Sequence, residues 1–555
     1  MKNDNGTIRL LPFGGLGEIG LNLMALEYDG KLLIIDCGLM FPEPAMLGVD
    51  LVVPEIGLLT RRSADIVGLV LTHGHEDHIG AVSYLWRQLG KPEIYATALT
   101  IGLLQAKLRE FNLSGVTTHV IRPRDEVILG PFQVEFFRAA HSIVDGVGLG
   151  IRTPAGLVVH TGDFKLDPTP VDGETTDLAR LAAYGEEGVL LLLSDSTNVE
   201  RDGYTLSEQT VGMALHRLLP TCSRRIYIGT FSSHIARICQ VLEAAQAHGR
   251  KVLIHGRSMV TSTAVARQLG YLNIPDDLLI NLSQLKRLPP EQTLVLTTGS
   301  QGEPLSVLAR MARDDHAQLQ LEEGDTVILS SRQIPGNEKA ITDMINHLYR
   351  RGAEVHYETT SEIHVSGHAC REELKQVLAL TRPQSFVPIH GEYRHLVKHA
   401  RLAVAMGVAP ERALVLENGQ SALFSVNGAS NAGTFESGRI FVDGKGVGDV
   451  GAVQLRDRSH LAHHGLVVAL LAVNRSTGVL LYGPELFTRG FVPEEERGDY
   501  LAAAAEIVRG VFSEHSVAAL TDLEELRIDV RKALRRFFIQ SIERRPLILP
   551  VVLEL

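Results

Sequence analysis

The chain of 555 residues is poor in cysteine and in aromatic residues, and it has no long apolar run. Its four cysteines lie far apart and form no CxxC pair, which excludes a cysteine-rich zinc finger and favours free thiols in a reducing cytosol. No run approaches the roughly 18 apolar residues of a transmembrane helix. The first residues also lack the apolar core of a signal peptide. We therefore expect a cytoplasmic protein with no membrane association.

Positive charge is scarce as well. Lys and Arg number 54 against 65 Asp and Glu, which gives a net charge of −11. This balance argues against attraction of the whole surface to nucleic acid, although a local basic channel or bound cations can override the global sign. Histidine is abundant instead, with 22 residues, several of them clustered. The chemistry is therefore expected at the histidine clusters.

The length predicts two to four domains of roughly 100–200 residues each. Residues 1–206 alternate short apolar runs with Gly-rich turns, whereas 207–358 alternate strands and helices in the manner of a parallel sheet. The strand-then-histidine pattern of the first region returns in 359–426, so we expect 207–358 to be inserted into one domain. A linker rich in Gly, Ser and Asn is expected at 427–450, followed by a third unit at 451–555.

A glycine motif near the amino terminus resembles a dinucleotide-binding motif, but its context does not fit one. Residues Gly15 to Gly20 fit the GxGxxG pattern of dinucleotide-binding sites. That pattern needs a helix after it, to receive the pyrophosphate. Here the following segment, 22–38, reads as a hairpin that turns at Asp29-Gly30. We therefore expect a tight turn and no NAD.

The sharpest signal is the run HxHxDH, which directly follows the apolar run 66–72. In an extended segment residues i and i+2 share a face, so His73 and His75 can hold one ion. If the chain then enters a helix, Asp77 and His78 point at a second ion. Imidazole and carboxylate are ligands that zinc and manganese prefer, so the run predicts a metal centre with the identity of the metal open.

Two ions need more than four ligands, and three further candidates follow apolar runs. His141, Asp163 and His390 each come at the end of an expected strand. Each signal alone is weak, because a lone histidine after a strand is more often structural. Together they complete two coordination shells around a shared Asp163.

These residues, in this order, resemble the metal ligands of the metallo-β-lactamase superfamily. The insert between Asp163 and His390 is similar to that of its β-CASP branch, which acts on nucleic acids. The stretches FGGLGEIGLN, LTHGHEDHIGA, TGSQGEP, IPGNE and HVSGHA, together with the carboxyl-terminal unit, resemble the bacterial ribonuclease J family from about residue 8 to 555. The resemblance implies an α/β fold: an αββα sandwich with an inserted α/β β-CASP domain and a small α+β oligomerisation domain.

The resemblance also implies the reaction. The family trims RNA 5′→3′ from a 5′-monophosphate end and cuts internally, in RNA maturation, rRNA processing and mRNA decay. A hydroxide made by two Zn²⁺ or Mn²⁺ ions would attack the phosphodiester. The implied partners are RNA, a second copy or three further copies of the chain, and other RNA-decay proteins.

Roles for single residues are implied by the resemblance too. One ion would be held by His73, His75, His141 and Asp163, and the other by Asp77, His78, Asp163 and His390. Asp77 could also orient the hydroxide. Asp36 and Asp195 would hold ligand imidazoles in the right tautomer, although Asp36 also fits a plain strand-end turn residue.

The substrate contacts come from several loops. His368 would touch the scissile phosphate and protonate the leaving 3′ oxygen. The remaining implied substrate contacts are polar loop positions, namely Ser232, Ser233, His234, Asn337, His364, Val365, Ser366 and Gly367. From the sequence alone, Ser232-Ser233 also fits a helix N-cap. The resemblance further implies a structural calcium site near Asp50 and Asp443.

Other functions stay open at this point. A β-CASP nuclease could process 3′ ends or act on DNA, since phosphate contacts do not report the sugar. A small-molecule hydrolase is disfavoured because the insert and HVSGHA would have no role in it. An inactive RNA-binding scaffold is disfavoured by the full ligand set. The amphipathic helix at 522–540 fits a packed helix with a solvated basic face, carrying Arg527 and Arg531, as well as part of an oligomerisation domain.

Overall fold

The structure is a computed structural model, and it describes residues 6–331, 337–358, 361–444, 446–474, 479–491, 497–514 and 523–555. The chain forms two compact units. The first consists of Met1–Phe41 and Leu51–Ile440, and the second of Pro42–Asp50 and Phe441–Leu555. Among the described residues, no helix combines the length and the apolar character needed to cross a membrane.

Two sheets form the base of the first unit. The eight-stranded sheet has the order β22-β21-β1-β3-β4-β6-β7-β8, and the six-stranded sheet has the order β19-β13-β12-β11-β10-β9. The strands of the first are β1 (Ile8–Gly14), β3 (Leu23–Tyr28), β4 (Lys31–Ile35), β6 (Ile66–Val70), β7 (Ile94–Ala96), β8 (Thr118–Val120), β21 (Gln420–Ser425) and β22 (Gly428–Thr434). Those of the second are β9 (Glu126–Leu129), β10 (Phe132–Arg138), β11 (Val147–Thr153), β12 (Gly156–His160), β13 (Val189–Asp195) and β19 (Ser385–Ile389).

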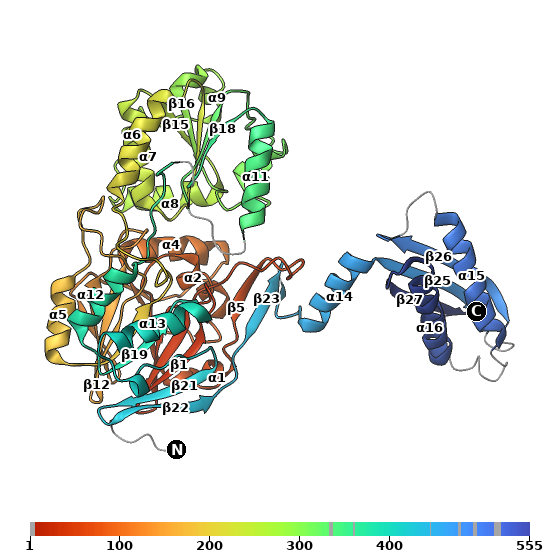
Figure 1. The fold of residues 1–555 in the computed structure, drawn as a ribbon, viewed down its shortest axis with the longest axis horizontal. Helices are drawn as coiled ribbons and strands as arrows, with labels where there is room; N and C mark the ends of the chain where they lie inside the picture. The colour runs from red at the N-terminus through yellow and green to blue at the C-terminus, as the bar shows by residue number, and fades with distance from the viewer. Residues whose placement is uncertain are drawn as a thin grey trace. The chain divides into compact units, whose positions relative to one another are not determined.

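The core of this unit lies between the two sheets. Leu33 of β4, Phe136 of β10 and Val387 of β19 belong to one buried apolar cluster. A second cluster packs helices α5 (Leu178–Glu187), α12 (Arg371–Thr381) and α13 (Tyr393–Ala405) against the six-stranded sheet. Central strands such as β3 and β13 are buried along their whole length, as strands covered on both faces are. Figure 1 shows these helices outside the sheets.

The predicted hairpin at 22–38 is confirmed. Strands β3 and β4 pair antiparallel, with Tyr28 opposite Lys31. Asp29 and Gly30 both have positive φ, 49° and 72°, as a two-residue turn with the right twist requires. This hairpin, and no helix, follows the GxGxxG segment.

The inserted segment forms its own parallel sheet, as predicted. Its order is β15-β16-β14-β17-β18, and every strand pair in it is parallel. The strands are β14 (Ile226–Gly229), β15 (Lys251–Ile254), β16 (Thr293–Thr297), β17 (Thr326–Leu329) and β18 (Glu354–His356). Helices α6 (Gln209–Leu218) and α7 (Ile235–Ala247) lie on one side of it and α11 (Glu338–Arg350) on the other (Figure 1). The strand order reverses between β14 and β17, and ligands bind at such points in open α/β sheets.

The segment 427–450 differs from the predicted linker because it contains strands. β22 pairs with β21 at the edge of the eight-stranded sheet, and β23 (Arg439–Asp443) forms a hairpin with β24 (Gly446–Val447). The side chains of β22 are exposed or half-buried. An edge strand with small polar residues lacks the apolar alternation that reveals a strand in a sequence.

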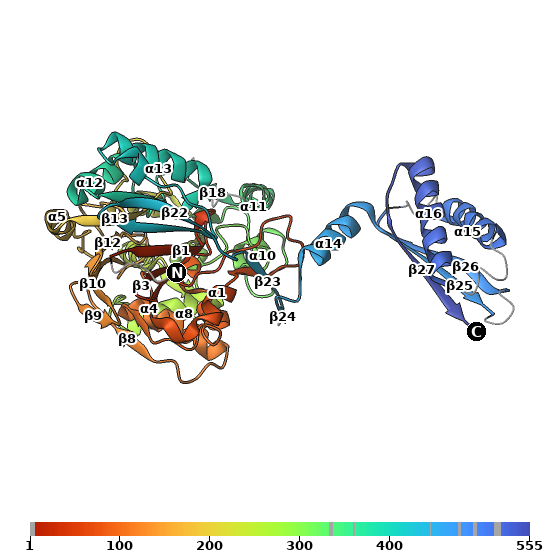
Figure 2. The same cartoon turned by 90° about the horizontal axis from the view of Figure 1, so that it is seen from below.

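The second unit contains a three-stranded sheet in the order β26-β25-β27. Its strands are β25 (Leu466–Val473), β26 (Leu480–Arg489) and β27 (Leu547–Glu554), and α14 (Ala452–His464) precedes them. Helices α15 (Arg497–Glu514) and α16 (Leu523–Ile542) cover one face of the sheet (Figure 2). Every fourth residue of α16 is buried from Leu526 to Phe538, whereas Arg531 is exposed, so the predicted amphipathic helix is confirmed.

Candidate metal centre

The HxHxDH run lies at the end of β6 and turns into a short helix. His75 precedes α2 (Glu76–Ile79), which contains Asp77 and His78. The backbone of the preceding hairpin holds this turn in place, because Cys37 N donates to His78 O at 2.7 Å. A Cβ on Gly38 would lie 1.5 Å from Asp77 O, so the approach of the two segments requires glycine there. The predicted strand-to-helix geometry of the motif is therefore present.

Three imidazoles form the first half of the centre. His73 Nε2 lies 3.0 Å from His75 Nδ1, and His141 Nε2 lies 3.2 Å from the same atom. His141 enters from the end of β10. Three ring nitrogens that converge on one point are a donor set for a divalent transition metal.

The second half consists of Asp77, His78, Asp163 and His390. His390 Nε2 lies 3.3 Å from Asp77 Oδ2 and 3.4 Å from Asp163 Oδ2. Asp163 Oδ2 also lies 3.3 Å from His78 Nε2. Asp163 and His390 follow β12 and β19, whose carboxyl ends meet at the same edge of the six-stranded sheet.

One oxygen of Asp163 connects the two halves. Besides its neighbours in the second half, Asp163 Oδ2 lies 3.8 Å from His73 Nε2 and 3.9 Å from His141 Nε2. The structure thus brings all seven sequence-predicted ligands together, with Asp163 in the middle.

The ring nitrogens that face away from the centre have protein partners. His78 Nδ1 lies 2.8 Å from Asp36 Oδ2, and His73 Nδ1 lies 3.1 Å from Thr72 Oγ1. Thr72 Oγ1 donates to Asp36 Oδ2 at 2.9 Å, so this carboxylate supports a ligand in each half. Such partners fix the tautomer and the orientation of a ligating imidazole.

Two more ligands are oriented in the same way. His141 Nδ1 donates to the carbonyl of Gly367 at 2.7 Å, and His390 Nδ1 lies 2.8 Å from Thr197 Oγ1. Sequence reasoning missed Thr72 and Thr197. The sequence shows only that each threonine lies close to a predicted site residue near the end of a strand, Thr72 before His73 and Thr197 two residues after Asp195.

The pKa values of the ligands differ between the two halves. Burial lowers the pKa of His73 and His141, and it lowers the pKa of His75 to about 4. Burial also acts to lower the pKa of His78 and His390, but nearby carboxylates, Asp163 first, outweigh it and raise both values. Three ligands are therefore neutral as metal binding requires, and two carry protons in the metal-free protein.

His368 stands next to the second half of the centre. Its Nδ1 lies 2.8 Å from Asp195 Oδ2, and its ring stacks on His390 with centroids 5.3 Å apart. Burial opposes ionisation of Asp195, yet the neighbouring histidines His368 and His390 hold the pKa of this carboxyl below its usual range. His368 is 19% exposed, more than its neighbours Asp195 and His390, so its ring can meet a substrate.

The HVSGH segment is held tightly around this ring. Ser366 Oγ accepts from Asn198 Nδ2 at 2.7 Å, and Val365 is buried. A Cβ on Gly367 would lie 2.6 Å from His141 Cε1, so the close approach to that ligand requires glycine. His364 lies in the same segment, half-buried.

The amino end of α7 is built differently from the prediction. The N-cap is His234, whose Nδ1 accepts from Arg237 N at 3.3 Å, so the alternative that Ser232-Ser233 caps this helix is wrong. The other ring nitrogen of His234 lies 3.0 Å from Glu208 Oε1, and the ring is buried. Both nitrogens thus have protein partners, and His234 belongs to an ion network with Glu208 and Arg237. Ser232 and Ser233 are half-buried.

Two other predicted groups lie elsewhere. Asn337 directly precedes α11, and residues 334–336 of the IPGNE motif lie outside the described residues. Asp50 Oδ2 accepts from Gly444 N at 2.7 Å, whereas Asp443 Oδ2 lies 2.5 Å from Arg458 Nη2. That guanidinium already balances one carboxylate of the predicted calcium site.

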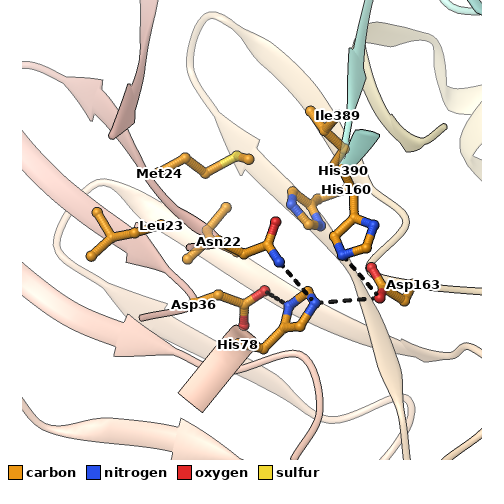
Figure 3. A pocket seen from close by; sticks show the side chains of 10 residues that line it. Asn22, Leu23, Met24, Asp36, His78, His160, Asp163, Ile389 and His390 are labelled. Atoms are coloured by element: carbon orange, nitrogen blue, oxygen red, sulfur yellow. Dashed lines mark hydrogen bonds and ion pairs between the residues drawn. The ribbon is translucent and has the colours of Figure 1, made fainter. Parts of the chain in front are cut away.

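A small cavity with both polar and apolar lining residues lies beside the ligands His78, Asp163 and His390 (Figure 3). Its volume of about 10 Å³ is enough for one water molecule. Asn22, Asp36, His78, His160 and Asp163 are among its lining residues, and Figure 3 shows His78 between Asp36 and Asp163. Asn22 Nδ2 lies 3.2 Å from His78 Nε2, a contact that the sequence did not predict.

Comparison with known families covers most of the chain. Residues 17–194 match "Metallo-beta-lactamase superfamily", 223–348 "Ribonuclease J, beta-CASP domain", 352–414 "Zn-dependent metallo-hydrolase RNA specificity domain", and 453–555 "Ribonuclease J C-terminal domain". The chain is 44% identical over 556 residues to the Ribonuclease J of Thermus thermophilus, across 99% of this chain and 95% of that protein. The chain belongs to the ribonuclease J family.

Other relatives agree with this membership. The identity is 38% to Ribonuclease J2 of Bacillus subtilis, over 100% of both chains. It is 45% to the Ribonuclease J of Synechocystis, over 87% of this chain and 76% of that protein. A crystal structure of a protein of unknown function from Enterococcus faecalis shares the fold, with a TM-score of 0.55 and 17% identity over 75% of this chain and 100% of that chain.

Family membership confirms the predicted fold class and the predicted activity. The chain has a metallo-β-lactamase domain with a β-CASP insert and a carboxyl-terminal ribonuclease J domain. It is a hydrolytic nuclease that acts on RNA, and its histidine–aspartate centre is a site for a divalent metal.

Proposed function

We propose that the chain degrades RNA 5′→3′ from 5′-monophosphate ends and also cuts RNA internally, in RNA maturation and mRNA decay. The observation that carries this proposal is the position of His368, which is held by Asp195 beside the convergent ligands. A metal centre and an acid on one side of it are what phosphodiester hydrolysis requires.

The donor set fits two Zn²⁺ or Mn²⁺ ions. His73, His75 and His141 would hold one, Asp77, His78 and His390 would hold the other, and Asp163 would serve both. Neutral imidazoles with carboxylates suit either metal. When bound, such ions make water a better nucleophile and offset the charge that develops on the phosphate.

The chain's own residues do the rest. Asp77 is the carboxylate placed to orient the attacking water, and it is partly exposed at 30%. As the water oxygen bonds to phosphorus, the P–O3′ bond breaks, and His368 gives its proton to the leaving 3′ oxygen. The products are a 3′-hydroxyl and a 5′-phosphate. Asp195 keeps the His368 ring oriented with its other nitrogen toward the substrate.

The preference for a 5′-monophosphate needs a second anion site. The amino end of α7 offers it, because a helix amino terminus attracts anions and two half-buried serines, Ser232 and Ser233, precede it. Ser366 and Asn337 are further candidate contacts. A triphosphate would be too large for a pocket built around one phosphate.

We propose the domain limits 1–206, 207–358, 359–426 and 451–555, and a homodimer or homotetramer formed through the last of these. All four cysteines are free thiols, which supports a location in the reducing cytoplasm. A calcium ion at Asp50 and Asp443, and contacts with other RNA-decay proteins, stay predictions.

An RNA labelled at its 3′ end tests the proposal directly. The protein is incubated with Mn²⁺ or Zn²⁺ and with 5′-monophosphate RNA, 5′-triphosphate RNA or the equivalent DNA. We expect progressive shortening from the 5′ end, faster with the monophosphate, and no comparable cleavage of DNA. Internal cuts that ignore the 5′ group would refute the exonuclease part.

A further inference from the structure

A buried charged cluster lies outside the metal centre, where the chain passes into and out of the inserted sheet. Glu208 is 3% exposed and Arg237 is 0% exposed. Lys165 and Asp167 are buried beside them, with Lys165 Nζ 3.2 Å from Asp167 Oδ2. Two cations and two carboxylates balance, so the cluster has no net charge.

The chain crosses between the two sheet domains twice, in a first passage at Glu208 and a second passage at Ile363. Glu208 connects the first passage to α7. Its Oε2 accepts from Arg237 Nη2 at 2.6 Å, and its Oε1 lies 3.0 Å from His234 Nε2. Its own backbone N–H donates to Asp167 Oδ2 at 2.9 Å. Glu208 therefore joins the amino end of α7, through its carboxylate, to the segment that follows the ligand Asp163, through its backbone N–H.

Arg237 reaches the second passage as well. Its Nη1 donates to the carbonyl of Ile363 at 2.9 Å, and Ser330 Oγ, at the end of β17, donates to the same carbonyl at 2.6 Å. Ile363 directly precedes the HVSGH segment. One guanidinium thus holds both passages between the two sheet domains.

Stability alone does not account for an arginine at this place. A buried ion pair is often no more stabilising than apolar side chains of similar volume. A planar guanidinium, however, fixes the relative position of its acceptors, because it donates several hydrogen bonds in a rigid fork. Its acceptors include Glu208 and Ile363, which belong to different passages of the chain, besides Gln240 and Ser330 within the inserted segment.

We propose that Arg237 is a positioning residue for RNA hydrolysis: through Ile363 it sets the place of His364–His368 relative to the amino end of α7. The inference rests on the proposed roles of His368 and of the two serines before α7. An RNA molecule whose 5′ phosphate is bound before α7 and whose backbone is cleaved beside His368 requires a fixed distance between the phosphate site and His368.

The test uses the double variant Glu208→Gln/Arg237→Met in the full-length chain. Both charges are removed together, so no buried charge is left without a partner. The kcat and KM are measured for 5′-monophosphate RNA and for bis(p-nitrophenyl) phosphate with Mn²⁺. The small diester reports the metal centre alone, because its leaving group needs no acid and it cannot span to α7.

We expect kcat on RNA to fall roughly 10²-fold, as misplacement by about 1 Å can cause, while kcat on the small diester changes by less than about two-fold. The matched control is Glu135→Gln/Arg152→Met, which removes an ion pair 3.0 Å long between β10 and β11, with Glu135 buried and Arg152 half-buried, and should preserve both activities. Arg237→Lys keeps the charge but loses the fork, and should show the same split between substrates.

Four results would overturn the inference. These are an unchanged kcat on RNA, an equal loss on both substrates, the same RNA-specific loss in the control, and full RNA activity in Arg237→Lys. If the double variant does not fold, Arg237→Lys alone decides. A wild-type protein that does not cleave RNA would overturn the proposed function, and this inference with it. If the wild type cleaves RNA and the variant cleaves it equally well, only the inference about Arg237 is overturned, and the proposed function stands.

Discussion

The Asp36 carboxylate lies 2.8 Å from Nδ1 of His78, and both side chains are buried. Asp36 also accepts from the hydroxyl of Thr72, which in turn contacts His73. A residue that touches no substrate thus orients a ligand in each half of the centre.

Asp36→Asn is therefore expected to weaken metal binding by roughly 10–100-fold while the fold persists, because the amide supports the imidazole less well than a carboxylate. Isothermal titration of the metal-free protein with Zn²⁺ measures the affinity. Asp29→Asn, in the hairpin turn, is the matched control and should bind as the wild type does. Wild-type affinity in Asp36→Asn would contradict the orienting role.

The two halves of the centre should respond differently to pH. In the metal-free protein the pKa values of His78 and His390 are raised, so both rings hold protons near neutral pH, whereas the pKa of His75 is lowered to about 4. An ion that enters the second half must displace protons, so its affinity should rise about 10-fold per pH unit for each proton displaced, below the raised pKa values.

The first half is already neutral above about pH 5 and should bind almost independently of pH. Titrations in buffers of different ionisation enthalpy count the protons released by each ion. His390→Ala should remove the pH-dependent event and keep the other. Equal proton release by both ions would contradict the difference in pKa.

Gly367→Ala is expected to lower RNA cleavage by at least about 10-fold, because the added Cβ would lie 2.6 Å from His141 Cε1 and displace this ligand. Metal content and kcat are measured together. Gly510→Ala is the control: it lies in α15 with nothing within 4 Å of the new Cβ, and should keep activity and stabilise the helix by about 0.5–1 kcal/mol. Full activity in Gly367→Ala would show that the contact is not required.

His368→Gln should lower kcat on RNA by about 10²–10⁴-fold, as loss of a general acid does, with two ions still bound. Metal analysis beside single-turnover kinetics separates the two effects. Loss of an ion in this variant would mean that His368 is a ligand and not the acid.

Much of the centre was predictable because its ligands follow apolar runs. His73, Asp163 and His390 each come within three residues of the end of a strand whose buried character is visible in the sequence. The spacing in HxHxDH then determines which atoms share a face. Local pattern and strand ends were sufficient to predict which seven side chains converge.

The rest depends on contacts between distant segments. Nothing near His141 in the sequence indicates that its partner is the carbonyl of Gly367, and nothing near Arg237 indicates Ile363. The resemblance implied His234 as a substrate contact, and no local pattern indicates that its ring is buried against Glu208, 26 residues earlier in the chain. β22 was missed because its small polar residues do not alternate.

We expect the centre to hold two ions, one on each side of Asp163. Anomalous diffraction at the zinc and manganese absorption edges, from crystals grown with each metal, tests it most directly. Two peaks are expected, one among His73, His75 and His141 and one among Asp77, His78 and His390, with Asp163 next to both. A single peak among Asp195, His368 and His390, which also converge with Asp163, would contradict it.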